Sequence, residues 1–283
     1  MIEFWGLFKQ NRGALIGLCL VAVVSLIALL APLLAPHDPT EVFAEALKLP
    51  PFWAEGAQAK FLLGTDDVGR DLLSRLIYGS RVSLGIGFLV VVFTTSFGTL
   101  LGLFAASLGP VIENLILRLM DILMALPSLL LAIVVVAILG PSLINTVIAV
   151  SIVSMPNVVR IVRASVLVEK NKNYVLASKS FGASWFHIYI KNVLPNCLAP
   201  LLVQATFGFS DGILNAAAFG FLGLGAQPPT PEWGTMLSDS RSFIESAPWL
   251  VTLPGVCILL VVVSFNILGD GLRDALDPKT RRI

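Results

Sequence analysis

The sequence predicts an all-α polytopic membrane protein with six transmembrane helices, and three observations support that prediction. Hydrophobic residues make up 56% of the 283 residues and charged residues 13%, about half the charged share of a soluble globular domain. The apolar residues are gathered into six long runs. The basic residues are divided unequally between the segments that join those runs, as in chains that cross a membrane several times.

Each apolar run is read as one span. A hydrocarbon core about 30 Å thick requires roughly 20 apolar residues in a helix that rises about 1.5 Å per residue. The predicted spans cover residues 14–35, 82–109, 119–139, 143–159, 198–222 and 249–268. The fourth is the weakest, because it is short and contains Pro156. The first lacks a small-residue cleavage pattern and is expected to be a retained span rather than a signal peptide.

The basic residues orient the spans. With the N-terminus inside, 13 of the 19 Lys and Arg residues fall in inner segments: Lys9, Arg12, Arg118, Arg160, Arg163, Lys170, Lys172, Lys179, Lys191, Arg273, Lys279, Arg281 and Arg282. The outer segments hold Lys48, Lys60, Arg70, Arg75, Arg81 and Arg241. Because basic residues concentrate on the cytoplasmic side, both termini and the segment 160–197 are expected to be cytoplasmic.

The long segment 37–81 is then external. Pro50, Pro51 and Trp53 predict an irregular loop in its first part. Residues 69–81 predict an amphipathic helix that lies on the membrane surface and leads into the second span. Its apolar side would carry Leu72, Leu73, Leu76 and Ile77, and its polar side Arg70, Asp71, Ser74 and Arg75.

The segment 174–196 interrupts the apolar runs with a predicted helical hairpin. Gly182 stands where a left-handed helix stop would lie, Ser184 is a good cap for a second helix, and Pro195 marks the entry into the fifth span. Small residues would let a partner approach closely, and large apolar residues beside the turn are typical of interface centres. The small residues are Ala177, Ser178 and Gly182, and the large ones Phe181, Trp185 and Phe186. The alternative is an amphipathic connector that rests on lipid headgroups.

This hairpin resembles the cytoplasmic "EAA" loop of permease subunits in binding-protein-dependent ABC importers. The resemblance rests on Ala177, Ser178, Gly182, Leu194 and Pro195, with Leu176 in place of the Glu that names the motif. Segments 62–87, 121–132, 220–239 and 265–279 look like the peptide and nickel branch of these importers. The last two look closest to the C-type permease subunits of dipeptide importers.

The resemblance implies a permease in the bacterial cytoplasmic (inner) membrane, with a tail, first span and external loop in residues 1–80 and a core permease domain in residues 81–283. The implied partners are a homologous second permease, two ATPase subunits and an external peptide-binding protein. The substrate would be dipeptides or short oligopeptides, with nickel, haem, aminolevulinate or antimicrobial peptides as alternatives. The coupling hairpin, within loop 160–197, would dock on an ATPase through Ala177, Ser178, Phe181, Gly182, Ala183, Ser184 and Trp185, with Leu194 and Pro195 at its base.

Several kinds of chemistry have no matching motif in the sequence. There is no G-x-x-x-x-G-K-[ST] and no Gly-Lys dipeptide, so ATP and Mg²⁺ are expected on partner subunits and no cofactor on this chain. His37 and His187 fall on opposite sides of the membrane, so an independent enzyme is not expected. The three Cys residues have no metal-ligand spacing. A formal net charge of +1 gives no indication of a nucleic-acid partner.

Polar residues inside or beside the spans are the candidates for a translocation path, namely Asp121, Gln204, Asp211 and Asn215. A carboxylate in lipid is costly, so Asp211 is expected to face the bundle interior or water. It would either line the path or pair with another subunit. A proton-coupled secondary transporter, the second class considered, would usually show several such residues and inverted repeats. A membrane scaffold would need no docking hairpin.

The orientation has a direct test. Because basic residues crowd the segment 160–191, a Cys in place of Lys172 should react with an impermeant thiol reagent only after the membrane is opened. A Cys in place of Glu55, in the external loop, should react in intact cells. Equal labelling of both in intact cells would overturn the orientation.

Overall fold

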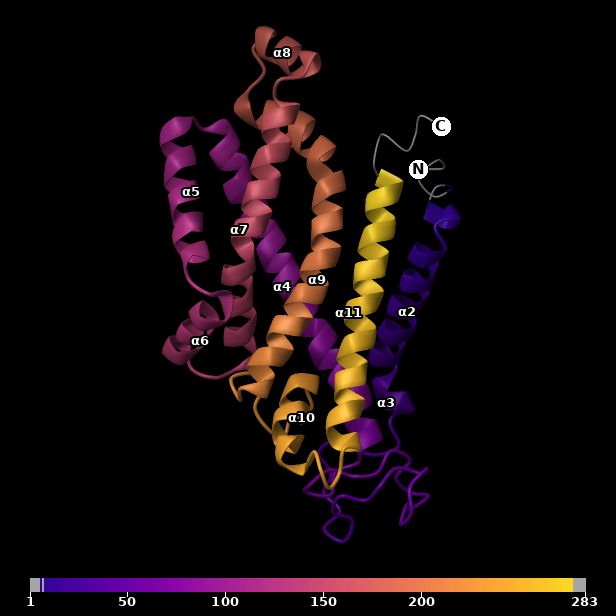
Figure 1. The fold of residues 1–283 in the computed structure, drawn as a ribbon. Coiled ribbons are helices and arrows are strands. Elements are labelled where there is room, and N and C mark those ends of the chain that lie inside the picture. The colour runs from indigo at the N-terminus through magenta and orange to yellow at the C-terminus, as the bar shows by residue number, and fades with distance from the viewer. Residues whose placement is uncertain (1–5, 7, 277–283) are drawn as a thin grey trace.

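The long helices of the chain run side by side along one axis, as the computed structural model shows (Figure 1). The structure describes residue 6 and residues 8–276. The helices are α2 (Arg12–Leu29), α3 (Ala31–Leu34), α4 (Leu72–Ser107), α5 (Pro110–Ala125), α6 (Ser128–Leu139), α7 (Leu143–Glu169), α8 (Asn173–Ser180), η1 (His187–Val193), η2 (Leu194–Cys197), α9 (Leu198–Phe221), α10 (Trp233–Ser240), η3 (Arg241–Phe243) and α11 (Trp249–Leu276). Lys279, Arg281 and Arg282, which contribute to the predicted orientation, lie outside the described residues.

The all-α membrane fold predicted from composition is confirmed. Among the described residues, five helices are long and apolar enough to cross a membrane, and a sixth crossing would come from the bent pair α5 and α6. The spans 143–159 and 249–268 lie inside α7 and α11, whereas 82–109 and 198–222 end one or two residues beyond α4 and α9, and 14–35 is divided between α2 and α3. The run 143–159 is part of a helix that continues to Glu169 with Pro156 inside it.

The third predicted span, 119–139, is not one helix, and the sequence prediction was wrong on this point. Helices α5 and α6 meet at Leu126 and Pro127 with a bend of 96°. Leu126 is extended, with φ −95° and ψ 143°, because a residue before proline is driven out of the helical region. Pro127 in turn has no N–H to continue the hydrogen-bond ladder. The apolar run is therefore broken near its middle (Figure 1).

The predicted surface helix over residues 69–81 was also wrong in its placement. Helix α4 begins at Leu72 and continues without a break into the second span. Asp71 starts it, since its carboxylate accepts a hydrogen bond from the backbone N–H of Ser74 at 3.0 Å. Ser74 and Arg75, the predicted exposed side, are buried. The side chain of Arg75 donates to the carbonyl oxygen of Pro39 at 3.2 Å, so the external loop covers this side of the helix.

Glycines set the close spacing of α4 against its two main neighbours. A Cβ on Gly102 would lie 2.7 Å from the carbonyl oxygen of Val159 in α7. A Cβ on Gly87 would lie 2.7 Å from the side chain of Ile213 in α9. Small residues at such crossings let helix backbones approach and gain dispersion contacts in lipid. Helices α4, α7 and α9 therefore form one closely packed group.

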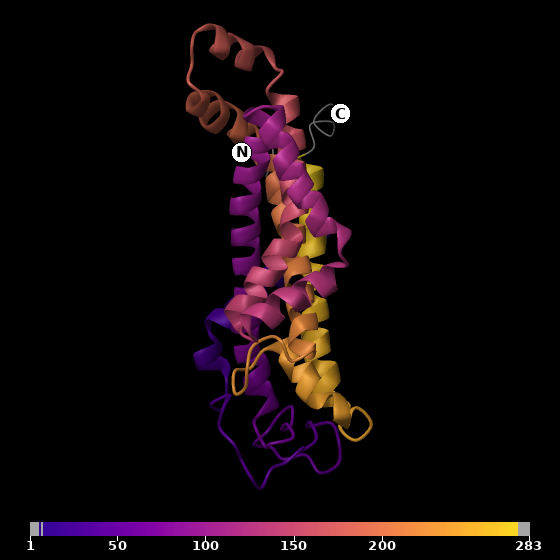
Figure 2. The ribbon, with the colours of Figure 1, turned by 90° about the vertical axis from the view of Figure 1, so that its left-hand side faces the viewer.

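The two ends of the bundle differ in character. Helix α8 projects beyond the bundle at the end where α2 begins and α11 ends (Figures 1 and 2). The opposite end carries the loop between α3 and α4, together with α10 (Figure 1). There the buried Glu232 carboxylate accepts backbone N–H groups of Gly234 and Thr235 at 2.8 Å each, and burial raises the pKa of this carboxyl group. The hairpin is thus the element that projects from its end of the helix bundle.

Candidate functional sites: an exposed hairpin and a polar hollow

The turn of the hairpin has the geometry that the sequence predicts. Gly182 has φ +75°, a left-handed conformation that glycine adopts without a steric penalty. Its N–H donates to the carbonyl of Lys179 at 2.9 Å, and the N–H of Ala183 donates to the carbonyl of Ser178 at 3.1 Å. These two bonds form a Schellman motif that closes α8. The predicted helix stop at Gly182 is confirmed.

The second arm of the hairpin starts as predicted but is less regular than expected. The hydroxyl of Ser184 accepts a weak hydrogen bond from the N–H of His187 at 3.4 Å, in the manner of a helix cap. From there the arm is π-helical (η1) and then 3₁₀-helical (η2) before α9 begins. Pro195 lies inside η2 and cannot donate a backbone hydrogen bond, so the ladder changes its spacing around it. The arm therefore runs into α9 without leaving the helical region.

The hairpin exposes an apolar tip. Phe181 is 91% exposed, and Leu176 and Phe186 are also exposed. Trp185, the other predicted docking anchor, instead packs against its own chain, with ring centroids 6.0 Å from Phe104 of α4 and 5.4 Å from Tyr189 of η1. Exposed large apolar side chains outside the lipid are typical of protein interaction sites. Phe181 is therefore the tip side chain that a partner could bury.

The base of the hairpin rests on the closely packed helices. Its inner side belongs to a buried cluster made of Leu103, Ala106, Val158, Val162, Val166, Val175, Ile188, Tyr189, Val193, Cys197 and Leu201, with Ala183, Trp185 and Leu194 at its edge. These residues come from α4, α7, α8, η1, η2 and α9. Protein interiors of this kind transmit displacements because they are close-packed. The hairpin is thus attached to the group formed by α4, α7 and α9.

A polar network that the sequence analysis missed joins the same elements. Glu169, at the end of α7, is 6% exposed and accepts hydrogen bonds from the Tyr174 hydroxyl and the Lys172 ammonium, each at 2.6 Å. The Asn196 side chain donates to the Tyr174 oxygen at 3.1 Å. Burial and the bond to Glu169 raise the pKa of Tyr174 to about 12, so the hydroxyl remains a donor at neutral pH. The available signal was Glu169, a single carboxylate ten residues after the fourth apolar run.

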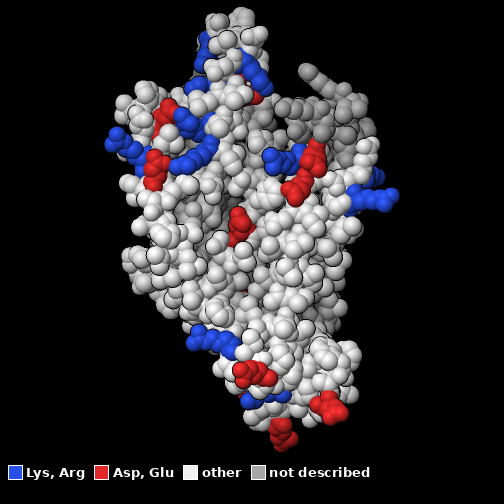
Figure 3. All heavy atoms as spheres, in the orientation of Figure 1, with Lys and Arg blue, Asp and Glu red and all other residues white. Residues whose placement is uncertain are grey.

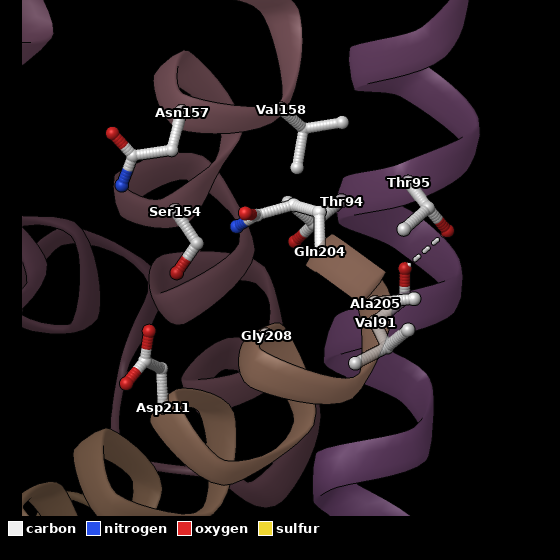
Figure 4. Close-up of a pocket in the computed structure, with 10 residues that line it drawn as sticks. All are labelled: Val91, Thr94, Thr95, Ser154, Asn157, Val158, Gln204, Ala205, Gly208 and Asp211. Carbon is white, nitrogen blue, oxygen red and sulfur yellow. Dashed lines mark hydrogen bonds between the residues drawn. The ribbon is translucent and has the colours of Figure 1, made fainter. Parts of the chain in front are cut away.

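A polar hollow lies further along the same three helices. It is lined by Val91, Thr94 and Thr95 of α4, Ser154, Asn157 and Val158 of α7, and Gln204, Ala205, Gly208 and Asp211 of α9 (Figure 4). The hydroxyl of Ser154 and the carboxylate of Asp211 face the same space (Figure 4). Gln204 also lines a second hollow, which extends to Asn196 at the hairpin base and to Arg273. The two hollows together reach from mid-span to the hairpin.

The structure brings together some of the predicted path residues and not others. Gln204 and Asp211 share the polar hollow, and Asn215 lies one turn beyond on α9, where its side chain donates to the carbonyl of Asp211 at 2.8 Å. Asp121 lies elsewhere, since its carboxylate pairs with Arg160 at 2.6 Å and so joins α5 to α7. On the face of the molecule that Figure 3 shows, charged side chains lie mainly toward the two ends, and acidic atoms also lie near the middle.

The two sites are surfaces suited to binding. Among the described residues, no group of three or more His, Cys, Asp or Glu side chains is placed to hold a metal ion. The geometry offers an exposed apolar tip at one end of the bundle and a polar hollow between helices. These features define a polytopic helical subunit of a membrane transport system.

The chain belongs to the family of binding-protein-dependent transport system inner membrane components, whose family model matches residues 98–282. A second model, the N-terminal TM domain of oligopeptide transport permease C, matches residues 1–51. The predicted family is thereby confirmed.

Curated relatives match along almost the whole chain. The dipeptide transport system permease protein DppC of Haemophilus influenzae is 56% identical over 280 residues, which cover 99% of this chain and 95% of that protein. The di/tripeptide transport system permease protein DppC of Pseudomonas aeruginosa is 58% identical over 279 residues, covering 99% and 92%. A chain of the MetNI methionine ABC transporter, solved in inward-facing conformations, matches with a TM-score of 0.60 and 19% identity over 72% of this chain and 96% of that chain. That likeness shows the shared fold.

The network at the hairpin base has a measurable consequence. Tyr174→Phe removes the hydroxyl that joins Glu169 to Asn196, whereas Ser180→Ala removes a hydroxyl that bonds within α8, to the carbonyl of Leu176. A hydrogen bond is worth about 1 kcal/mol net, so backbone hydrogen exchange in residues 173–181 should become about five-fold faster in Tyr174→Phe. Hydrogen–deuterium exchange of the chain in lipid nanodiscs measures this. Equal exchange in the two variants would show that the network does not hold the hairpin.

Proposed function

We propose that this chain is a permease subunit of an ATP-driven importer that carries dipeptides or short oligopeptides into the cell. The observation that carries the proposal is the attachment of the exposed hairpin to α4, α7 and α9, the three helices that line the polar hollow. A force on the tip is thereby passed to the helices beside the hollow. The peptide class follows from the names of the relatives that match nearly the full chain.

The energy for transport comes from other chains in this proposal. The sequence has no phosphate-binding loop, so two ATPase subunits hold ATP and Mg²⁺, and this chain makes or breaks no covalent bond. Phe181 enters a groove on one ATPase, beside the exposed Ala177, Gly182 and Ser184. Trp185 and Leu194 seat the hairpin on its own bundle rather than reaching the partner. ATP binding and hydrolysis supply the differential free energy between the inward-open and outward-open states.

The polar hollow forms one side of the translocation path. It lies on a face of this chain where Asp211 and Asn157 are exposed, and a homologous second permease closes the other side. Residues 81–283 form the core permease domain. The hairpin end is cytoplasmic, because six of the basic residues lie in the segment 160–191, and both termini lie on that side of the bacterial inner membrane. The opposite end receives the peptide-binding protein.

The docking role predicts the effect of two substitutions. Burial of an aromatic side chain contributes about 1.5 to 3 kcal/mol, so Phe181→Ala should weaken ATPase binding about 10- to 100-fold. Gly182→Val has no neighbour to clash with, but a β-branched residue resists φ +75°, so the tip should be displaced. Both variants should insert normally and lose peptide uptake. Co-purification of the ATPase subunits with tagged permease, beside an uptake assay, provides the measurement.

The matched control is Phe52→Ala, because Phe52 is also an exposed phenylalanine (66%) but lies in the loop at the other end of the bundle. ATPase co-purification with this variant should equal that of the wild type. If Phe181→Ala and Gly182→Val both retain bound ATPase and full uptake, the hairpin is a connector that rests on headgroups, and the proposed coupling fails.

A further inference from the structure

Asp211 occupies an unusual position for a charged residue. It lies near the middle of α9, and the sequences of α9, of α7 up to residue 159 and of α4 from residue 82 contain no other Asp, Glu, Lys or Arg. An ionised group at this depth is retained where it faces water or a partner of opposite charge. Its presence therefore requires a cation or a hydrated path.

The described part of the chain places no cation against Asp211. Within residues 8–276 the structure places no donor against the Asp211 carboxylate, and the side chain is exposed on the isolated chain. The basic residue nearest along α7, Arg160, is paired with Asp121. The carboxylate is therefore available to a group that comes from outside the chain.

Neutral polar groups share the hollow with the carboxylate. The Ser154 hydroxyl points toward it from α7, Asn157 lies one turn further along α7, and Gln204 lies two turns away on α9 (Figure 4). Thr94, only 4% exposed, also lines the hollow, and its hydroxyl has no hydrogen-bond partner among the described residues. Hydroxyl and amide groups can both donate to and accept from a peptide unit. The hollow thus combines one negative charge with unused hydrogen-bonding capacity.

We propose that Asp211 receives the N-terminal ammonium group of the peptide in transit, while the neutral groups of the hollow contact its amide. The inference rests on the proposed function. Dipeptides differ in their side chains but share a primary ammonium beside a peptide bond, and that ammonium is largely protonated at neutral pH. A hollow that reads these shared groups accepts many dipeptides.

The weakness of a single hydrated ion contact suits this role. Transport requires that the substrate bind strongly enough to enter the site and weakly enough to leave it. An exposed ion pair is a weak interaction, so the peptide is oriented but not trapped. These three helices carry no basic residue at this depth that could bind the peptide carboxylate. The peptide is therefore oriented with its amino end toward Asp211.

A charge-selective labelling experiment tests the proposal. Ser154→Cys replaces a hydroxyl by a thiol of similar size beside Asp211, in a chain whose Cys19, Cys197 and Cys257 are replaced by Ala. The complete transporter in lipid nanodiscs is treated with 2-aminoethyl methanethiosulfonate, which carries a primary ammonium, or with its anionic sulfonate analogue. Rates are normalised to those with a free thiol. An ionised carboxylate that faces the same hollow should favour the ammonium reagent roughly 3- to 10-fold.

Variants at residue 211 separate charge from shape. In the Ser154→Cys background, Asp211→Glu should keep the preference for the ammonium reagent, and Asp211→Asn should abolish it. Saturating dipeptide should slow labelling with Asp211 present and slow it less with Asp211→Asn. The control is Ser180→Cys on the hairpin, where the ratio of the two rates should be the same with Asp or Asn at 211. Dipeptide uptake should fall in Asp211→Asn and recover in Asp211→Glu, with the second permease still bound.

Two results would overturn the proposal. A thiol at 154 that neither reagent reaches would place Asp211 in a sealed contact between subunits. A thiol that reacts without charge preference, whichever residue stands at 211, would show that no ionised carboxylate faces the path. Neither result depends on coupling through the hairpin, because the charge preference is measured without ATP. Failure of the wild-type transporter to import dipeptides would instead refute the proposed function.

Discussion

The hairpin holds its position because its base is packed against the helices of the bundle. A hairpin of this length cannot hold a fixed position alone, because helices as short as its two arms are only marginally stable by themselves in water. Val175, Ile188 and Val193 bury its inner side against α4 and α7, and Glu169 anchors the Tyr174 hydroxyl from below. Phe181 is left exposed on a rigid support, so its contacts act on the helices beneath.

Close helix packing extends that rigidity to the polar hollow. Gly98 and Gly102 bring α4 against Val158 and Val159 of α7, and Gly212 brings α9 against Val90 of α4. A residue with a Cβ at any of these glycines would push the helices apart and so change the hollow between them. The same three helices therefore both support the tip and carry Thr94, Ser154 and Asp211. The exposed tip and the lining of the hollow are therefore two surfaces of one packed group of helices.

The sequence predicted the features that depend on neighbouring residues. The stop at Gly182 and the cap at Ser184 are local, because each needs a backbone conformation that few residue types favour. The break at Pro127 has a local signal too, but proline is compatible with a kink inside one span as well as with a sharp bend between two helices. The packing around the run decides between them.

The predictions that failed, or that residue patterns could not make, depend on contacts between distant segments. The polar side of the helix that starts at Leu72 is buried because the external loop covers Arg75, and a helical pattern cannot show which side another segment will cover. Trp185 and Phe181 are equally apolar, yet Trp185 turns inward because Phe104 is beside it. Gln204 and Asp211 were recognisable on one helix, whereas Ser154 and Asn157 of α7, which line the same hollow, could be placed beside them only from the fold.

The hairpin and the helices of the hollow are expected to move as one body. Double electron–electron resonance between spin labels at Ser180, beside the tip, and at Ile144, at the far end of α7, tests it in the complete transporter. The distance should stay the same and equally narrow in the nucleotide-free and ATP-bound states, while water access to residue 154 changes between them. A distance that shifts or broadens on ATP binding, with access to residue 154 unchanged, would contradict the claim.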